Sequence, residues 1–330
     1  MISWVYVTDT SIMVSWFIIG VAVFALWIIV QYFMDQVYLD TAGKYVLITG
    51  CDSGFGNLLT RTLGKHRGCC VIAACLTEGA ATQLKQEMAV AGQPVTTIVL
   101  DVTNTQSIKQ AYNEVRGIIP SDQGLWGLVN NAGINTPKGA YEWLKREEIN
   151  KIFQVNFMGT VEVTSTFLPL LRQARGRVVN MSSCSVMLPY VETAYTASKM
   201  AVEAYSDNLR FSQRKQGITV HILEPGAFKT WIANPENVLG SQRRLWERLT
   251  EEERQQYGGI ERFKRDEAIM KIGLQAASSK LHHVTGAMEH ALCSRWPWRR
   301  YLPGLDAKFV FKPLSLMPAF VVDFVLGLIV

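Results

Sequence analysis

Two kinds of hydrophobic pattern alternate along the chain after residue 44. Short runs that are apolar almost throughout, and rich in Val and Ile, are separated by longer stretches with helical periodicity. The short runs are typical of strands buried on both faces of a parallel sheet, and the longer stretches of amphipathic helices. We predict strands at residues 45–49, 70–75, 96–100, 127–130, 177–181 and 219–223, and helices at 55–66, 80–91, 105–118, 145–172 and 193–213, with less regular ones near 243–253 and 262–279.

This order of elements predicts one Rossmann-type α/β domain. Strands that alternate with helices form a doubly wound parallel sheet with helices on both faces. We place this single domain at residues 44–312 and find no internal repeat.

The segment 12–30 departs from the alternation, because its 19 residues contain no charge and no proline. A helix of about 19 residues is roughly 29 Å long, close to the thickness of a bilayer core. The segment lacks the basic n-region and small-x-small cleavage site of a signal peptide, and a soluble helix apolar on every face would need wrapping on all sides. We therefore predict a transmembrane anchor within residues 1–31 and a linker at 32–43.

The C-terminal run 313–330 is also apolar, but Pro318 and Asp323 argue against a second span. We expect an apolar helix here, either a lid that contacts lipid or a helix that completes the core. Before it, the sequence RWPWRR at 295–300 mixes basic and indole side chains. Such a mixture suits a lipid headgroup layer, although an ordinary surface corner explains it equally well.

Composition narrows the class of protein. The chain has 330 residues, of which 48% are hydrophobic and 18% charged, so it is long and apolar enough for a large folded core. The net charge of +5 is modest and the basic residues are scattered, which argues against nucleic acid as a partner. The six cysteines include no CxxC pair and no cluster with histidine, so we expect neither a disulfide framework nor a metal site.

The stretch TGCDSGFGN at 49–57 follows the first predicted strand. Glycines at this position let the backbone approach a pyrophosphate, and the helix that follows offers unpaired N–H groups. The spacing of Gly50, Gly54 and Gly56 differs from G-x-G-x-x-G, so by itself the stretch fits a phosphate cradle and a simple tight turn equally.

Three downstream residues suggest chemistry. Tyr195 and Lys199 lie one helical turn apart on a single face. A nearby ammonium favours the phenolate form of a tyrosine, and such a pair can exchange a proton with an alcohol or carbonyl. Ser183 follows the predicted strand 177–181, at the sheet edge where ligands bind, and its hydroxyl can donate to a substrate oxygen. Each feature alone also fits an ordinary surface pair or a strand-end turn.

Taken together and in order, the motifs resemble the short-chain dehydrogenase/reductase family. They are TGxxxGxG at 49–56, an acidic residue at 101, NNAG at 130–133, Asn156, Ser183, YxxxK at 195–199 and PG at 225–226. Several phrases, such as GLWGLVNNAGI and LEPGAFKT, resemble the membrane-bound retinol and hydroxysteroid dehydrogenases, and also mitochondrial 3-hydroxybutyrate dehydrogenase.

The resemblance implies a role for each matched residue. Tyr195 would be the general acid/base, Lys199 would lower its pKa and bind the nicotinamide ribose, Ser183 would hold the substrate oxygen, and Asn156 would support a water in the proton relay. For Asn130, a structural role between strands is equally open. The cofactor-binding residues that it implies are Gly50, Asp52, Ser53, Gly54, Phe55, Gly56, Asp101, Val102, Asn130, Ala132, Gly133, Tyr195, Lys199, Pro225, Gly226, Phe228 and Thr230.

The choice of cofactor leans toward NAD, with NADP less favoured. A 2′-phosphate calls for Arg or Lys near the first turn or the end of the second strand, where this chain has Asp52 and Glu78 instead. The usual ribose-binding aspartate at the end of the second strand is also missing, because Cys75 or Leu76 stands there.

The anchor and a C-terminal tail similar to that of the retinol and steroid enzymes favour a lipophilic alcohol, retinol or a hydroxysteroid. A 3-hydroxybutyrate-type dehydrogenase is the alternative, and an idle nucleotide-binding scaffold or redox sensor a remote one. The segment 184–194 lacks the glycines common in that branch, which leaves the exact substrate open.

Without an Arg/Ser-rich presequence, we expect the endoplasmic reticulum membrane, with a mitochondrial membrane as the alternative. A homodimer, the membrane sidedness and the direction of the reaction stay open.

Overall fold

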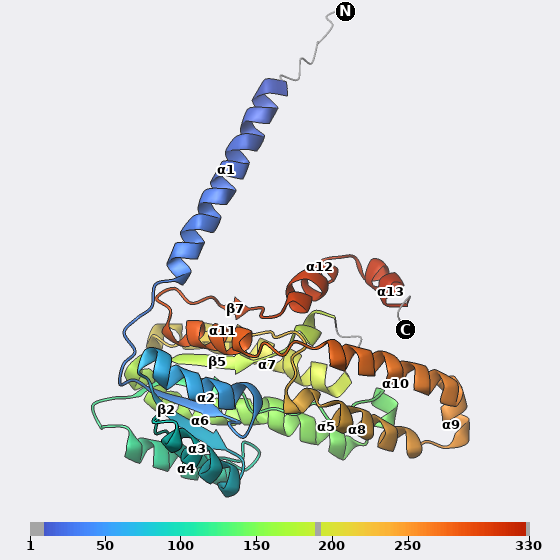
Figure 1. Ribbon diagram of the computed structural model, residues 1–330, viewed down its shortest axis with the longest axis horizontal. Coiled ribbons are helices and arrows are strands. Elements are labelled where there is room, and N and C mark those ends of the chain that lie inside the picture. The colour runs from blue at the N-terminus through green and yellow to red at the C-terminus, as the bar shows by residue number, and fades with distance from the viewer. Residues whose placement is uncertain (1–9, 189–192, 328–330) are drawn as a thin grey trace, which may run out of the picture.

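The computed structural model describes residues 10–188 and 193–327, and its centre is a seven-stranded sheet (Figure 1). The strand order is β3-β2-β1-β4-β5-β6-β7, and every pairing is parallel. This architecture confirms the doubly wound α/β class. The strands are β1 Tyr45–Thr49, β2 Cys70–Cys75, β3 Thr96–Val99, β4 Leu125–Asn130, β5 Arg177–Met181, β6 Thr219–Leu223 and β7 Arg300–Tyr301.

Helices cover both faces of the sheet, as buried apolar strands require. One hydrophobic core forms with α2 (Gly54–Arg67), α3 (Glu78–Val90) and α11 (His282–Cys293). The other forms with α4 (Thr105–Ile118), α6 (Gly159–Ala174) and α7 (Thr193–Ser212). Successive side chains of β1 alternate between the two cores: Val46 and Ile48 enter the first, and Leu47 enters the second.

Several elements differ from the expectation. The predicted helix 145–172 is α5 (Arg146–Phe153) and α6 joined by a π-helical turn, Gln154–Met158. The helix expected near 243–253 is divided between two helices. The first begins earlier, because Asn234 caps it with its side chain and Pro235 occupies its first turn, and the second begins after its cap, Thr250. The elements here are α8 Pro235–Glu247, α9 Glu251–Gln256 and α10 Gly259–Ala276, and the sequence did not predict α11 or β7.

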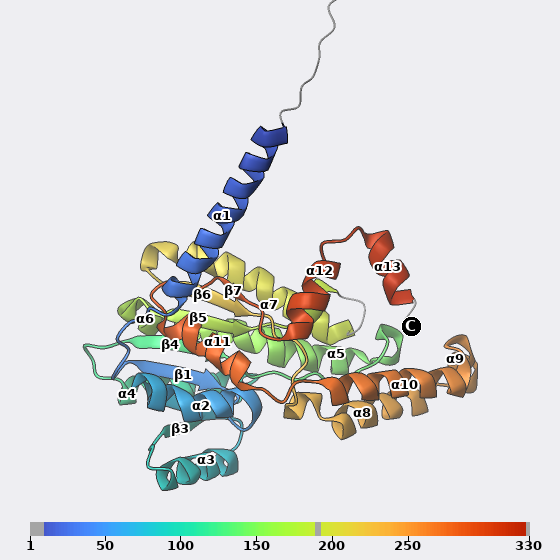
Figure 2. The same cartoon turned by 45° about the horizontal axis from the view of Figure 1, so that its top comes forward.

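Helix α1 (Thr10–Asp35) projects away from the domain in both views (Figures 1 and 2). Its segment Met13–Asp35 is 23 residues long and apolar enough to cross a membrane.

The C-terminal run is two helical pieces rather than the single predicted helix. The first combines a π turn, Ala307–Phe311, with α12 (Lys312–Leu314), and the second is α13 (Ala319–Gly327). Both pieces lie on the same side of the domain as α1 (Figures 1 and 2).

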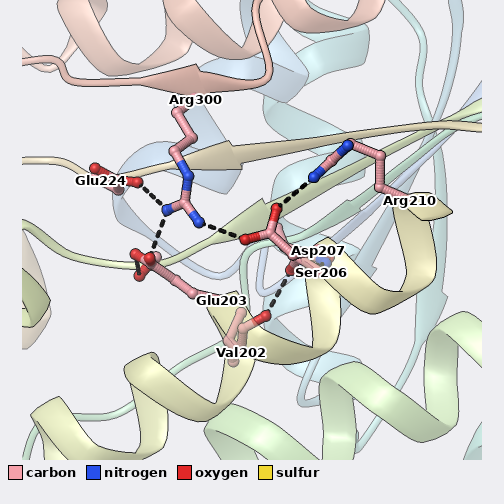
Figure 3. Close-up of polar contacts among 9 residues, drawn as sticks. Val202, Glu203, Ser206, Asp207, Arg210, Glu224 and Arg300 are labelled. Carbon is pink, nitrogen blue, oxygen red and sulfur yellow. Dashed lines mark hydrogen bonds and ion pairs between the residues drawn. The ribbon is translucent and has the colours of Figure 1, made fainter.

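An arginine of β7 ties the end of the sheet to α7 (Figure 3). The Arg300 guanidinium donates to the carboxylates of Glu203 and Asp207 on α7 and to Glu224, directly after β6. Glu203 also accepts a hydrogen bond of 2.7 Å from the Ser182 hydroxyl at the end of β5. Glu224 is buried, and both burial and the charge of Glu203 raise its pKa.

Replacing this arginine should destabilise the fold in a pH-dependent way. We expect Arg300→Gln to lower the free energy of unfolding by about 1–3 kcal/mol at pH 7.5, because Glu224 then keeps a buried charge without its partner. The Glu224 pKa is already raised, so lowering the pH protonates its carboxyl and the deficit relative to wild type should shrink at pH 5. Denaturant unfolding of the detergent-solubilised full chain measures both values.

Arg299→Gln provides the matched control, because Arg299 is exposed and makes no ion pair within the described residues. It should leave stability nearly unchanged. Equal losses for the two variants, or an Arg300→Gln deficit that grows at acid pH, would contradict this account.

Candidate active site

A cavity of about 1180 Å³ opens at the carboxyl ends of the parallel strands. Segments that follow β1, β2, β3, β4, β5 and β6 all contribute to its lining. This is the edge of a doubly wound sheet where ligands bind. All the predicted site residues line it except Gly56, Asn130 and Asn156.

The glycine turn forms one wall of the cavity. Gly50 has φ +67° and Gly54 has φ +62°, backbone conformations that glycine adopts without strain. A Cβ atom at Gly50 would lie 2.9 Å from the Ala132 Cα, so β1 and the segment after β4 approach too closely for any other residue. The turn leads directly into the N-terminus of α2, whose first N–H groups have no intrahelical acceptor.

Gly56 does not line the cavity but packs against the backbone of the glycine turn. A Cβ there would lie 2.5 Å from the Gly50 carbonyl oxygen. The turn is further fixed by Asn131, which the sequence did not single out: its Nδ2 donates to the carbonyls of Thr49 at 2.9 Å and Gly50 at 3.0 Å. The Thr49 hydroxyl in return accepts from the Asn131 backbone N–H at 3.0 Å. The ends of β1 and β4 are therefore held as one unit.

Asn130 lies in the sheet interior, away from the cavity. Its Nδ2 donates to Thr164 Oγ1 and to Asn180 Oδ1, each at 2.8 Å, so it ties β4 to α6 and β5. This geometry agrees with the structural role that the sequence left open for it. A contact of Asn130 with cofactor stays a prediction.

Asn156 is fully buried in the π-helical turn and connects the segment after β4 to α7. Its Oδ1 accepts from the Ile134 N–H at 2.8 Å, and its Nδ2 donates to the Ile134 carbonyl at 2.9 Å and to Ser198 Oγ at 3.0 Å. Ser198 Oγ donates in turn to the Tyr195 carbonyl at 2.6 Å. The side chain of Asn156 thus positions the helix that carries Tyr195, while its support of a relay water stays a prediction.

Lys199 is the most constrained residue of the site. Its side chain is buried, with the residue only 4% exposed, and Nζ donates to the Met181 carbonyl at 2.9 Å, at the end of β5. Burial lowers the pKa of Lys199 to about 8, so the ammonium is charged at neutral pH. Nζ lies 5.7 Å from the centroid of the Tyr195 ring. Both side chains line the cavity, as the i and i+4 spacing predicts.

Ser183 faces the same space from the other side. It follows β5 in an extended conformation, and its Oγ accepts from the Ser185 N–H at 3.2 Å, which fixes the oxygen while leaving its own proton to donate. The structure therefore brings Ser183, Tyr195 and Lys199 to one cavity.

The loop after β6 closes the cavity over the glycine turn. Phe228 meets Phe55 edge to face, with ring centroids 5.7 Å apart. The loop is held by Asp306, whose Oδ2 accepts from the Ala227 N–H at 2.6 Å. Asp306 packs so closely on Gly226 that a Cβ there would overlap its carboxylate. No local pattern in the sequence indicates Asp306, because its contact joins residues 79 apart in the chain.

Much of the cavity lining is apolar, and several of its apolar residues were not predicted from the sequence. They are Ile134, Val155, Trp231, Ile232, Leu274 and Phe311. These residues come from five separate segments, so only the fold gathers them. Residues 189–192, part of the glycine-poor segment before Tyr195, lie outside the described residues.

Asp52 occupies the space where the end of β2 meets the glycine turn. Both of its carboxylate oxygens accept from the Leu76 N–H, at 3.0 and 3.1 Å. Leu76 follows β2, where the sequence shows no aspartate, so Asp52 places a carboxylate beside the end of that strand.

The model of the short chain dehydrogenase family matches residues 44–238, more than half of the chain. Short-chain dehydrogenase/reductase family 9C member 7 of Bos taurus is 47% identical over 288 residues, covering 87% of this chain and 90% of the relative. Retinol dehydrogenase 7 of Rattus norvegicus is 44% identical, covering 92% and 95%. The 17-beta-hydroxysteroid dehydrogenase type 6 of Mus musculus is also 44% identical, covering 89% and 90%.

Solved structures agree on the fold. A short-chain dehydrogenase/reductase from Burkholderia phymatum in complex with NAD superposes with a TM-score of 0.68 at 21% identity, covering 83% of this chain and 93% of that one. A short-chain dehydrogenase from Streptomyces avermitilis gives 0.65 at 26% identity, covering 86% and 97%. The chain therefore belongs to the short-chain dehydrogenase/reductase family, in the branch that includes the retinol and hydroxysteroid dehydrogenases.

Proposed function

We propose that this protein oxidises a lipophilic secondary or primary alcohol, or reduces the matching carbonyl, with NAD(H) as cofactor. The observation that carries the proposal is the meeting of Ser183, Tyr195 and Lys199 in a cavity whose lining is largely apolar. An idle nucleotide-binding scaffold has no chemical need for all three groups.

The cavity fits a nicotinamide dinucleotide. Gly50 has no Cβ atom, so the backbone of its turn borders the cavity without a side chain in between. The N-terminus of α2 points its free N–H groups to the same place. Asp101 and Val102 line the part of the cavity beyond β3, where we place the adenine. When bound, the nicotinamide ring supplies or accepts the hydride.

The chain's own residues handle the proton. The Lys199 ammonium, fixed by the Met181 carbonyl, favours the charged form of the Tyr195 phenol, so that its hydroxyl exchanges a proton with the substrate oxygen. Ser183 Oγ donates to that oxygen as its charge grows. Asn156 keeps α7, and with it Tyr195, at a fixed distance from the segment after β4.

The largely apolar lining of the cavity favours a retinoid or steroid over a small hydroxy acid. A hydroxy acid needs a cation to bind its carboxylate, and the described lining offers only Lys151 besides Lys199. Lys199 already donates to the Met181 carbonyl. The relatives named as retinol and 17-beta-hydroxysteroid dehydrogenases support the same class of substrate.

Helix α1 supports membrane anchoring, which suits a substrate dissolved in lipid. We place the anchor at residues 1–31, the linker at 32–43 and the catalytic domain at 44–312, with the endoplasmic reticulum as the membrane. The exposed apolar side chains of α1 and its projection from the domain support an anchor, and the helix continues past residue 31 to Asp35, into the proposed linker (Figure 2).

A substrate panel tests the proposed reaction. We expect the detergent-solubilised full chain to reduce NAD with retinol or androstane alcohols, followed by absorbance of the reduced cofactor, and to be inactive with 3-hydroxybutyrate. Tyr195→Phe should bind NADH as wild type does but lose about 10²–10⁴ in turnover, because proton transfer is lost.

Tyr141→Phe serves as the control, because Tyr141 is exposed and outside the cavity lining. It should remain fully active. Activity with hydroxybutyrate alone would refute the lipophilic substrate, and a fully active Tyr195→Phe would refute the proton-transfer role.

The preference for NAD should depend on Asp52. Its carboxylate lies in the cavity at the end of β2, where it would repel a 2′-phosphate. We expect Asp52→Asn to reduce the ratio of the NADP to NAD dissociation constants by roughly tenfold, about 1.4 kcal/mol. Nucleotide titrations followed by tryptophan fluorescence measure the two constants.

Glu78→Gln removes a nearby charge at the start of α3, outside the cavity lining, and should leave the ratio unchanged. A wild-type protein that binds NADP at least as tightly as NAD would contradict the assignment of Asp52.

A further inference from the structure

A second groove of about 1140 Å³ lies at the foot of α1 and shares no lining residue with the catalytic cavity. The last turns of α1, from Trp27 to Asp35, form one side of it. The end of α7, the start of β6 and the loop 295–300 form the other sides. The groove therefore lies where the anchor meets the domain (Figures 1 and 2).

The groove carries positive charge that the protein does not neutralise. Arg214, Arg295 and Arg299 line it, and none has an acidic partner within residues 10–188 and 193–327. Of the other lining arginines, Arg210 pairs with Asp207 and Arg300 with the acidic cluster of Figure 3.

The acidic side chain in the groove already has hydrogen-bonding and charged partners. Asp35 is the sole acidic side chain in the described lining, and its Oδ1 accepts from the Trp298 Nε1 at 2.8 Å. The same Oδ1 lies 3.7 Å from His290 Nε2. Asp35 thus holds the end of α1 to the loop 295–300, and Arg214, Arg295 and Arg299 line the groove without a counterion from the described part of the chain.

Aromatic side chains accompany these arginines. Trp296 and Trp298 are about half exposed, and Phe211 is 78% exposed. Trp27 and Tyr32 of α1 complete the aromatic lining. Tryptophan, tyrosine and arginine together are typical of the layer between the hydrocarbon core and water.

The depth of the groove matches that layer. The candidate span starts at Met13, and about 20 residues of helix cross a hydrocarbon core, which brings the boundary to about Tyr32. The exposed apolar residues Phe309, Phe320 and Phe324 lie on the C-terminal helical pieces and Leu316 in the turn between them, on the same side of the domain as α1 (Figure 1). The face that carries the groove is thus the face turned to the bilayer.

We propose that this groove binds the phosphate-bearing headgroup of an anionic phospholipid in the leaflet that holds the foot of α1. Arg295 and Arg299 contact the phosphate, and the indoles of Trp296 and Trp298 lie beside the glycerol and upper acyl chains. The proposal rests on membrane anchoring by α1 and is independent of the reaction that the enzyme catalyses. Its physical basis is the match, at the same depth, between guanidinium groups that lack acidic partners among the described residues and a phosphate-bearing headgroup whose net charge is negative.

Calorimetric titration of the full chain in neutral detergent tests the headgroup site. The probes are dihexanoyl phosphatidylserine, dihexanoyl phosphatidylcholine and inorganic phosphate. We expect saturable binding of phosphatidylserine, with one lipid per chain, and much weaker binding of the other two. The double variant Arg295→Gln/Arg299→Gln should weaken it by roughly thirtyfold, since each basic side chain near an anionic lipid contributes about a factor of five.

The matched control is Arg116→Gln/Arg146→Gln, which removes the same charge from exposed positions on α4 and α5. It should bind phosphatidylserine as wild type does. Equal weakening in both double variants, equal affinity for phosphatidylcholine, or inorganic phosphate binding as tightly as the lipid would each overturn the proposal.

Flotation with phosphatidylcholine vesicles separates this proposal from the anchor. Wild type and Arg295→Gln/Arg299→Gln should both float, because α1 alone inserts. A wild-type chain that does not float would overturn both the anchor and the headgroup site. A wild-type chain that floats but binds phosphatidylserine and phosphatidylcholine equally in the calorimetric titration would overturn the headgroup site alone.

Discussion

The burial of one charged side chain, Lys199, is the constraint on which the active site depends. An ammonium without water is costly unless an acceptor meets it, and here the Met181 carbonyl at the end of β5 does so at 2.9 Å. Because that carbonyl belongs to the sheet and Lys199 to α7, strand and helix are held in one register. Tyr195 lies one turn away on the same helix, and Ser183 lies two residues after Met181, so both are positioned by the same contact.

Supporting contacts extend outward from this one. Asn156 fixes α7 to the segment after β4, and Asn131 fixes that segment to the glycine turn. Arg300 of β7 binds both Glu203, which lies one turn beyond Lys199 on α7, and Glu224, which directly follows β6. Neighbouring side chains with buried or multiple hydrogen bonds thus hold the residues that line the cavity, and the positions of the reacting groups are fixed by these bonds.

Much of this could be predicted from the sequence, because strand periodicity and the glycine turn are local signals. The six strands were found from the apolar runs alone, whereas the grouping of Ser183, Tyr195 and Lys199 needed the ordered set of motifs that resembles the family. The remainder depends on distant contacts. The two residues of β7 are too short to show a pattern, Asp306 contacts Gly226 from 80 positions away, and the apolar residues of the cavity lining come from five segments. The contact of Asp52 with the Leu76 N–H joins the glycine turn to the end of β2, which no single-strand pattern reveals.

The central claim, that the buried ammonium of Lys199 controls the Tyr195 phenol, has a direct measurement. The ultraviolet absorbance of tyrosinate is titrated with pH in wild type and in Tyr195→Phe, and the difference isolates the signal of Tyr195. The same difference is taken in the Lys199→Met background. The account predicts that the phenol ionises at a clearly lower pH when Lys199 is present, since the ammonium stabilises the phenolate. Superimposable titrations in the two backgrounds would contradict it.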